Sequence, residues 1–314
     1  MGAKPFVHAA FAAATVAALC AAPQHAAADA ARAWAAAKDN LPAQTALVIG
    51  ADLTAITKTK LFNTFLALAM AKEPDAKKVF ETIKTSCQID PLTAVHGVVY
   101  ATDADRKQGA VYLSLGAGLD QAKLASCAEQ VAKSQGVKDP KLTVKKTGAI
   151  TEISTDKEKL YVSWIGTDVL VVGSDVHDKA ALEKWVGQKG GLAKSPVAKL
   201  HGGTNTKGAI WGVSSLTKEL DPGVKMKSAY GALTVAGGNL GLDLHTTLDS
   251  AKAATDAVAK ANAQLTQMSS GAQLPPNVKA LLQQVSVKSV GPDVAVKASV
   301  PEADLLGLLS LMNQ

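Results

Sequence analysis

Hydrophobic and polar positions along this chain switch between two periods. Alternating positions, or a short apolar run bounded by glycine or charged residues, predict a strand, whereas apolar positions spaced three or four apart predict a helix. These rules predict strands at 46–53, 97–102, 110–115, 142–146, 149–154, 160–164, 169–173, 209–213, 229–236, 240–248, 285–290 and 293–300. They predict helices at 60–72, 75–86, 120–133, 179–186, 250–268 and 302–312.

The order of these elements repeats along the chain. Residues 214–217, which follow the first strand of the second part, parallel residues 51–54, which follow the first strand of all. The turn at 166–169 is echoed at 291–294, with glycine and aspartate in the same places. Short loops between successive strands favour antiparallel pairing. We therefore predict an α+β fold of two similar halves, each an antiparallel sheet with helices packed on one face, related by a degenerate internal duplication.

The boundaries of these parts follow from composition. Residues 1–30 have a positive Lys4, an apolar run at 6–19 and small residues before Ala28 and Ala30, as in a cleaved secretory signal peptide. Lipidation of Cys20 is disfavoured because Leu19 precedes it where a small residue belongs. We expect an exported protein, periplasmic or extracellular. The first half then covers 31–190, a linker rich in glycine and polar residues covers 191–208, and the second half covers 209–314.

Two cysteines remain once the leader is set aside. Cys87 follows the predicted helix 75–86, and Cys127 lies on the helix 120–133. An even cysteine count in an exported chain favours a disulfide between them. Two buried free thiols are the alternative interpretation.

Charge and aromatic content exclude several partners. The chain has 33 basic and 27 acidic residues, a net charge of +6. All the basic residues except Arg32 and Arg106 are lysines, and they are dispersed among acidic residues. Nucleic-acid recognition relies on arginine forks and basic stripes, so we predict no nucleic-acid partner. An aromatic content of 4% argues against a carbohydrate-binding platform.

Catalytic and metal-binding patterns are weak in this sequence. The four histidines after the leader are not spaced as metal ligands, and we predict no metal site and no cofactor. The segment 188–195 lacks both glycines of a phosphate-binding loop. Asp243 and His245 share one face of a predicted strand and are the one polar pair that could interact. We favour a solvated polar face there, because no activated nucleophile accompanies the pair.

The helix predicted at 302–312 is more apolar than one buried stripe requires. Packing between the sheet and a neighbouring helix is the favoured explanation. A homodimer contact or a lipid-facing helix is the alternative, and we expect no other membrane association.

Three segments resemble exported proteins of unknown function from large-genome Gram-negative bacteria: residues 41–48, residues 87–92 and residues 119–124. The resemblance implies no activity and no catalytic residue. We predict an exported, non-enzymatic envelope protein that binds a protein partner or an apolar ligand. The alternatives are a periplasmic hydrolase with a site assembled around Asp243 and His245, and a purely structural secreted protein.

Overall fold

The computed structural model describes residues 30–137, 140–155, 158–221, 223–270 and 275–312. The predicted leader lies outside these residues apart from Ala30, which begins the first helix. The helices are α2 (Ala30–Asn40), α3 (Leu53–Ile56), α4 (Lys60–Lys72), α5 (Pro74–Ser86), α6 (Gln121–Ser134), α7 (Lys179–Glu183), α8 (Ala198–His201), α9 (Ala251–Ser270), α10 (Pro276–Gln283) and α11 (Glu302–Met312), with a 3₁₀ turn, η1 (Leu192–Lys194).

The strands are β1 (Leu47–Asp52), β2 (Val95–Thr102), β3 (Gly109–Leu115), β4 (Thr143–Thr147), β5 (Ile150–Ser154), β6 (Lys159–Ile165), β7 (Val169–Gly173), β8 (Ile210–Ser214), β9 (Lys218–Asp221), β10 (Val224–Ala236), β11 (Asn239–Leu248), β12 (Ser286–Val290) and β13 (Asp293–Pro301). The α+β class and the antiparallel pairing predicted from the sequence are confirmed.

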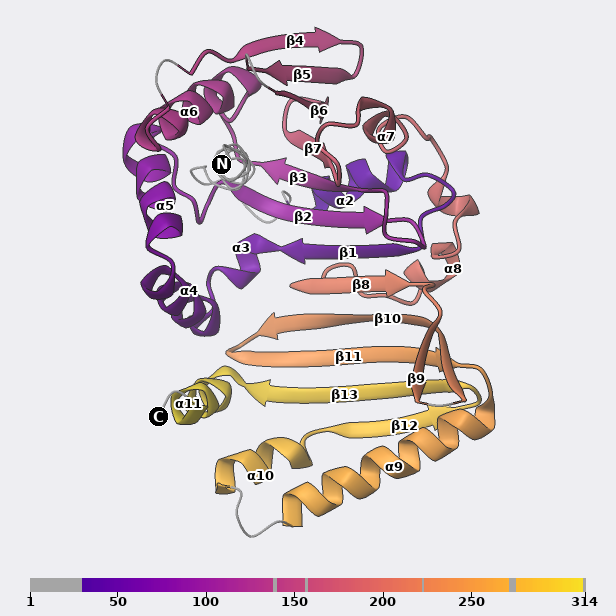
Figure 1. Cartoon of the computed structure of the whole chain (residues 1–314). Coiled ribbons are helices and arrows are strands. Elements are labelled where there is room, and N and C mark those ends of the chain that lie inside the picture. The colour runs from indigo at the N-terminus through magenta and orange to yellow at the C-terminus, as the bar shows by residue number, and fades with distance from the viewer. Residues whose placement is uncertain (1–29, 138–139, 156–157, 222, 271–274, 313–314) are drawn as a thin grey trace, which may run out of the picture.

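All these strands belong to one continuous sheet. Its order is β12-β13-β11-β10-β8-β1-β2-β3-β7-β6-β5-β4, and β9 pairs with β10 alone. The strand that begins each predicted half lies at the centre, where β1 pairs antiparallel with β8 (Figure 1). The two halves therefore share one sheet through hydrogen bonds between β1 and β8.

Several helices begin at side chains that accept a hydrogen bond from the first turn. Asp120 accepts from the backbone N–H of Lys123 at the start of α6, and Asp178 does the same for α7. Thr59 caps α4 in the same way. Such a cap satisfies a backbone donor that the helix leaves unpaired, so the polar residue before each apolar segment sets where the helix begins.

One buried core lies on the side of the sheet that carries α2, which we call the α2 face. Trp185 and Trp211 are both buried there beneath α2 and α8. A Cβ atom on Gly50 would lie 2.2 Å from the ring of Trp211, so only glycine allows that ring to lie on β1. The core joins residues of both halves, including Val48 and Ala232.

The segment predicted as a linker, 191–208, is part of this core. Leu192 and Val197 are buried in it, and the backbone of Gly191 passes so close to Leu41 that a Cβ atom would lie 2.2 Å from the Leu41 carbonyl oxygen. Its glycines and polar residues therefore permit close packing of η1 and α8 against this core.

A second core lies on the other side of the sheet, which we call the open face. There α5 and α6 pack on β3 and β7, with Ile83 and Val131 fully buried. Cys87 and Cys127 form a disulfide between the end of α5 and the middle of α6, as predicted. Helices therefore cover both faces of the first half, and the prediction of helices on one face is wrong for it. The reason is that its strands are apolar on both sides, as the fully buried strand β7 shows.

Candidate functional site

The open face carries a continuous apolar surface across its central strands. Side chains that are paired across neighbouring strands point to the same face. One row of paired residues is Ala51, Ile210, Leu233 and Leu242, on β1, β8, β10 and β11 in turn. The adjacent row is Ile49, Gly212, Gly231 and Leu244. Both rows consist of apolar residues and glycine alone.

Four of these side chains are unusually exposed for central strands. The exposed fractions are 41% for Ile49, 39% for Ile210, 37% for Leu242 and 38% for Leu244. Together they present roughly 300 Å² of apolar surface, in the size range of patches that are often functional on monomeric proteins. We call these two rows together the apolar strip: Ile49, Ala51, Ile210, Gly212, Gly231, Leu233, Leu242 and Leu244.

The apolar strip is exposed because the helices pack elsewhere. On the open face, α5 and α6 cover β3 and β7, and α9 lies along β12 and reaches β13 and β11. The helices that pack on β1, β8 and β10 are α2 and α8, which occupy the α2 face. Figure 1 shows the strands β8, β10 and β11 crossing the middle of the molecule, with α5 and α6 in the upper part of the view and α9 at the bottom.

Two glycines lie side by side within the strip. Gly212 on β8 pairs with Gly231 on β10, and Ile49 and Leu244 flank them. A Cβ atom on Gly212 would meet Ile49 Cγ1 at 3.6 Å, an ordinary contact, whereas one on Gly231 would lie 2.4 Å from the Asp243 carbonyl oxygen. The absence of side chains here lowers the centre of the strip relative to Ile49 and Leu244.

The predicted polar pair lies on the α2 face of the same strands. His245 Nε2 is 2.9 Å from Asp243 Oδ1, and Lys297 Nζ donates to Asp243 Oδ2 at 2.9 Å. The ring of Tyr230 stacks on the His245 ring with centroids 4.7 Å apart. Partial burial raises the pKa of Asp243, but Lys297 and then His245 favour the carboxylate, so the pKa lies below its ordinary value. Asp243 and His245, which the sequence places on one strand face, are therefore in contact on a polar face of the sheet.

This arrangement does not assemble a nucleophile. In the described part of the chain, the partners of His245 are Asp243 and Tyr230, and no serine or threonine hydroxyl bonds to its ring. A carboxylate and an imidazole activate a nucleophile only when a hydroxyl or thiol lies within hydrogen-bond reach of the imidazole. Asp243 instead balances the charge of Lys297, as expected of a solvated polar face.

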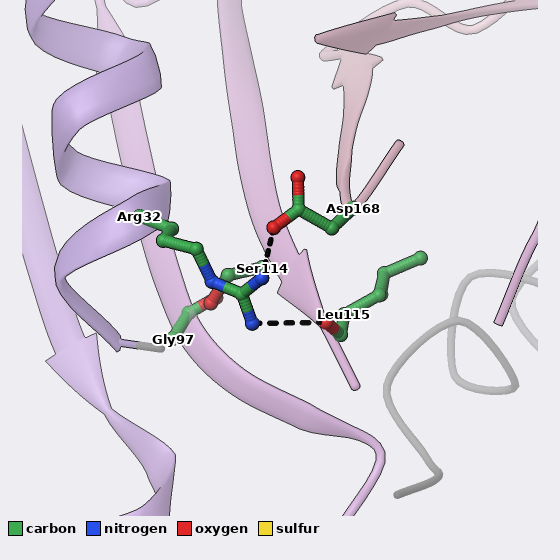
Figure 2. Close-up of polar contacts among 5 residues, drawn as sticks. All are labelled: Arg32, Gly97, Ser114, Leu115 and Asp168. Atoms are coloured by element: carbon green, nitrogen blue, oxygen red, sulfur yellow. Dashed lines mark hydrogen bonds and ion pairs between the residues drawn. The ribbon is translucent and has the colours of Figure 1, made fainter. Parts of the chain in front are cut away.

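A further polar contact that the sequence pattern did not indicate anchors the first helix (Figure 2). Arg32, on α2, forms an ion pair with Asp168 in the turn between β6 and β7, and its Nη2 donates to the Leu115 carbonyl oxygen at 3.5 Å. Beside it, Ser114 Oγ donates to the Gly97 carbonyl oxygen at 3.4 Å. The one signal in the sequence was that Arg32 is one of only two arginines, with Arg106, among 33 basic residues.

Aromatic side chains gather where α2 and α8 meet β8. Trp34 contacts both His201 and Trp211, with ring centroids 4.8 Å apart in each pair. Burial lowers the pKa of His201, and the charge of Lys38 lowers that pKa further. The imidazole of His201 packed on the indole of Trp34 is a structural contact between α8 and α2.

Other predicted features can be placed as well. Among the described residues, no group of three or more histidine, cysteine or acidic side chains could hold a metal ion. No helix in the described ranges is both long and apolar enough to span a membrane. The helix α11 packs on β13 and α4, and Glu302 accepts a hydrogen bond from the Leu61 backbone N–H at 2.6 Å.

Comparisons with known proteins add little. No protein-family profile and no curated protein matches the chain. The solved structures that it resembles include crystal forms III, I and IV of TP0453. Form III has a TM-score of 0.45 and 11% identity over 86% of this chain and 96% of that chain. Form I has a TM-score of 0.43 and form IV has a TM-score of 0.44. Each is 12% identical in sequence, over 88% of this chain and 98% of that chain. We transfer no residue role from them.

Proposed function

We propose that this chain is an exported, non-enzymatic envelope protein that binds a protein partner or an apolar ligand through the apolar strip. The observation that carries the proposal is the exposure of Ile49, Ile210, Leu242 and Leu244, each about two-fifths exposed, in adjacent rows at the centre of the sheet. Central strands usually lie beneath a helix or a second sheet. A charge-free surface in this position is suited to an apolar occupant.

Two features favour binding over the alternative functions. The histidine that a hydrolase would use has a carboxylate and a tyrosine ring as its neighbours, with no nucleophile bonded to it. The strip presents roughly 300 Å² of apolar surface, the size of the largest apolar patch on a typical monomer, and such patches are often functional.

The disulfide supports the proposed export. Cys87 and Cys127 join two helices that have few buried residues of their own. Such bridges persist in oxidising compartments and are rare in the cytosol. The Cys87–Cys127 bridge therefore fits the leader-like segment at 1–30, and with it a periplasmic or extracellular location.

We also propose that the chain arose by internal duplication, with the strip at the junction of the two copies. Outward from the centre, β1-β2-β3-β7-β6 mirrors β8-β10-β11-β13-β12. In each series the first three strands lie in the sheet in the same order as in the chain, and the last two lie in the opposite order. The helix α6 precedes the final strands of the first series, and α9 precedes those of the second.

The similar segments of the sequence fit this arrangement. The offset that relates residues 51–54 to 214–217 also equates Ile49 with Gly212. These two residues are paired across β1 and β8, as equivalent residues must be at a two-fold axis. The apolar strip therefore surrounds the proposed axis, between the two equivalent helical layers.

The proposal can be tested with the apolar dye Nile red. We expect wild-type protein to bind the dye with an increase in its fluorescence, and Leu244→Lys to weaken that binding about tenfold, because a charge then lies in the strip. Val290→Lys is the matched control: Val290 is an apolar strand residue that is 81% exposed on the α2 face. Equal dye binding by Leu244→Lys and wild type would contradict the proposal.

A hydrolase would respond differently in the same set of proteins. His245→Gln should leave dye binding unchanged and should produce no loss of activity on simple esters. Measurable ester turnover in wild type that disappears in His245→Gln would favour the enzyme.

A further inference from the structure

We infer that the occupant of the apolar strip is a single amphipathic α-helix of a partner protein, lying along β8 and β10. The inference rests on the proposed function and specifies its partner. It follows from the breadth of the uncovered strands, the shape of their surface, its area and its chemistry.

The breadth of the uncovered surface corresponds to one helix. Strands β1, β8, β10 and β11 are consecutive in the sheet, so the side chains of Ile49 and Leu244 at its two margins are separated by three strand spacings. That is about 14 Å at roughly 4.8 Å per spacing. An α-helix with side chains is about 10–12 Å across. The width of the surface that helices leave uncovered on the open face therefore matches the width of one helix.

The relief of the surface favours the same occupant. Gly212 and Gly231 lie on the two middle strands, and Ile49 and Leu244 rise on either side of them. An apolar side chain from a helix above β8 and β10 would enter this low centre and contact both flanking residues. A single acyl chain is about as wide as one strand spacing of roughly 4.8 Å, so it would leave most of the strip in water.

The area argues against a second copy of this chain or a large globular partner. Stable protein–protein interfaces bury about 800 Å² on each partner. The strip presents roughly 300 Å². A single helix that docks through three or four side chains on one face makes a smaller contact than a globular partner does.

The chemistry specifies the pattern of the partner helix. The paired rows of the strip hold isoleucine, leucine, alanine and glycine, while Asp243, His245 and Lys297 lie on the α2 face. The partner must therefore present apolar residues at positions i, i+3 or i+4, and i+7, with its polar residues directed away from the sheet.

The test is a displayed peptide library selected on the folded protein, with its disulfide intact. Each peptide has about 14 residues, which is roughly 21 Å as a helix. We expect enriched peptides to share the i, i+3 or i+4, i+7 apolar pattern and to become helical on binding, as circular dichroism would show. Apolar residues at every second position, or no enrichment above an unrelated protein, would overturn the inference.

Three variants locate the binding site of the selected peptides. Gly212→Val fills the low centre of the strip without a backbone clash, because the nearest atoms to a Cβ are at 3.5 and 3.6 Å. We expect it and Leu244→Lys to weaken peptide binding at least about tenfold in fluorescence anisotropy, and Val290→Lys to leave it unchanged. Unchanged binding by Gly212→Val and Leu244→Lys would overturn the inference.

The same variants separate this inference from the proposed function. If Nile red binds the wild type and is lost in Leu244→Lys while no helical peptide is selected, the strip binds apolar ligands and the helix inference is wrong. If neither dye nor peptide depends on Leu244, the proposed function itself is wrong.

Discussion

Glycines decide the close approaches in the centre of this sheet. Gly50 leaves space for the indole of Trp211 on the α2 face, whereas Gly212 and Gly231 lower the open face between Ile49 and Leu244. Each of these positions lies within a strand, where glycine weakens pairing unless a close approach requires it. The same residue type thus permits burial on one face and shapes an exposed surface on the other.

The two strip glycines should respond differently to alanine. A Cβ on Gly231 would lie 2.4 Å from the Asp243 carbonyl oxygen and 2.8 Å from Leu244 Cα, so Gly231→Ala must move backbone. We expect it to lower the free energy of unfolding by about 1–3 kcal/mol. Gly212→Ala meets ordinary contacts only and should stay within about 0.5 kcal/mol of wild type. Urea denaturation measures both, and equal destabilisation by the two substitutions would contradict this account.

At the scale of elements, the sequence pattern located twelve of the thirteen strands of the described residues, and it set bounds for the helices α4, α5, α6, α7, α9 and α11. The predicted strand 240–248 became β11, and the predicted helix 120–133 became α6 to within one residue at each end. The pattern set no bounds for α2, because alanine-rich residues carry little periodicity. It missed α8, because a short helix among glycines and polar residues looks like a loop.

The disulfide should contribute stability by constraining the unfolded chain, and in the folded protein it holds α5 against α6. Ile83 is the one residue of α5 that is buried in the described structure, so the helix has little other anchorage beside Cys87. With a sequence separation of 40, we expect the double substitution Cys87→Ala, Cys127→Ala to lower the free energy of unfolding by about 3–4 kcal/mol.

Dye binding at the strip should be unchanged in the double substitution and serves as its control, because α5 and α6 cover β3 and β7 rather than β8 and β10. Reduction of wild type should produce the same loss of stability as the double substitution. If the disulfide contributed nothing to stability, its removal would leave the urea midpoint of unfolding unchanged.

At the scale of the whole molecule, the two halves depend on each other. Strand β1 has β8 as a hydrogen-bonding neighbour, and the core on the α2 face includes Trp211 and Val213 from the second half. We therefore expect a fragment of residues 31–208 to lack cooperative unfolding by circular dichroism, since it loses both the strand partner and that part of its core. Co-expression with residues 209–314 should restore it. A fragment that unfolds as sharply as the full chain would show that the halves are independent domains.

Sequence patterns predicted most of the elements and their antiparallel pairing and favoured a disulfide between Cys87 and Cys127, because local periodicity and a cysteine count carry that information. They also placed Asp243 and His245 on one strand face. Which apolar residues remain exposed depends instead on long-range packing. The alternation in β11 marks Leu242 and Leu244 as core residues, yet their burial depends on whether a helix distant in sequence lies above them. Helices α2 and α8 instead pack on the other face of these central strands, and this long-range choice leaves the apolar strip open.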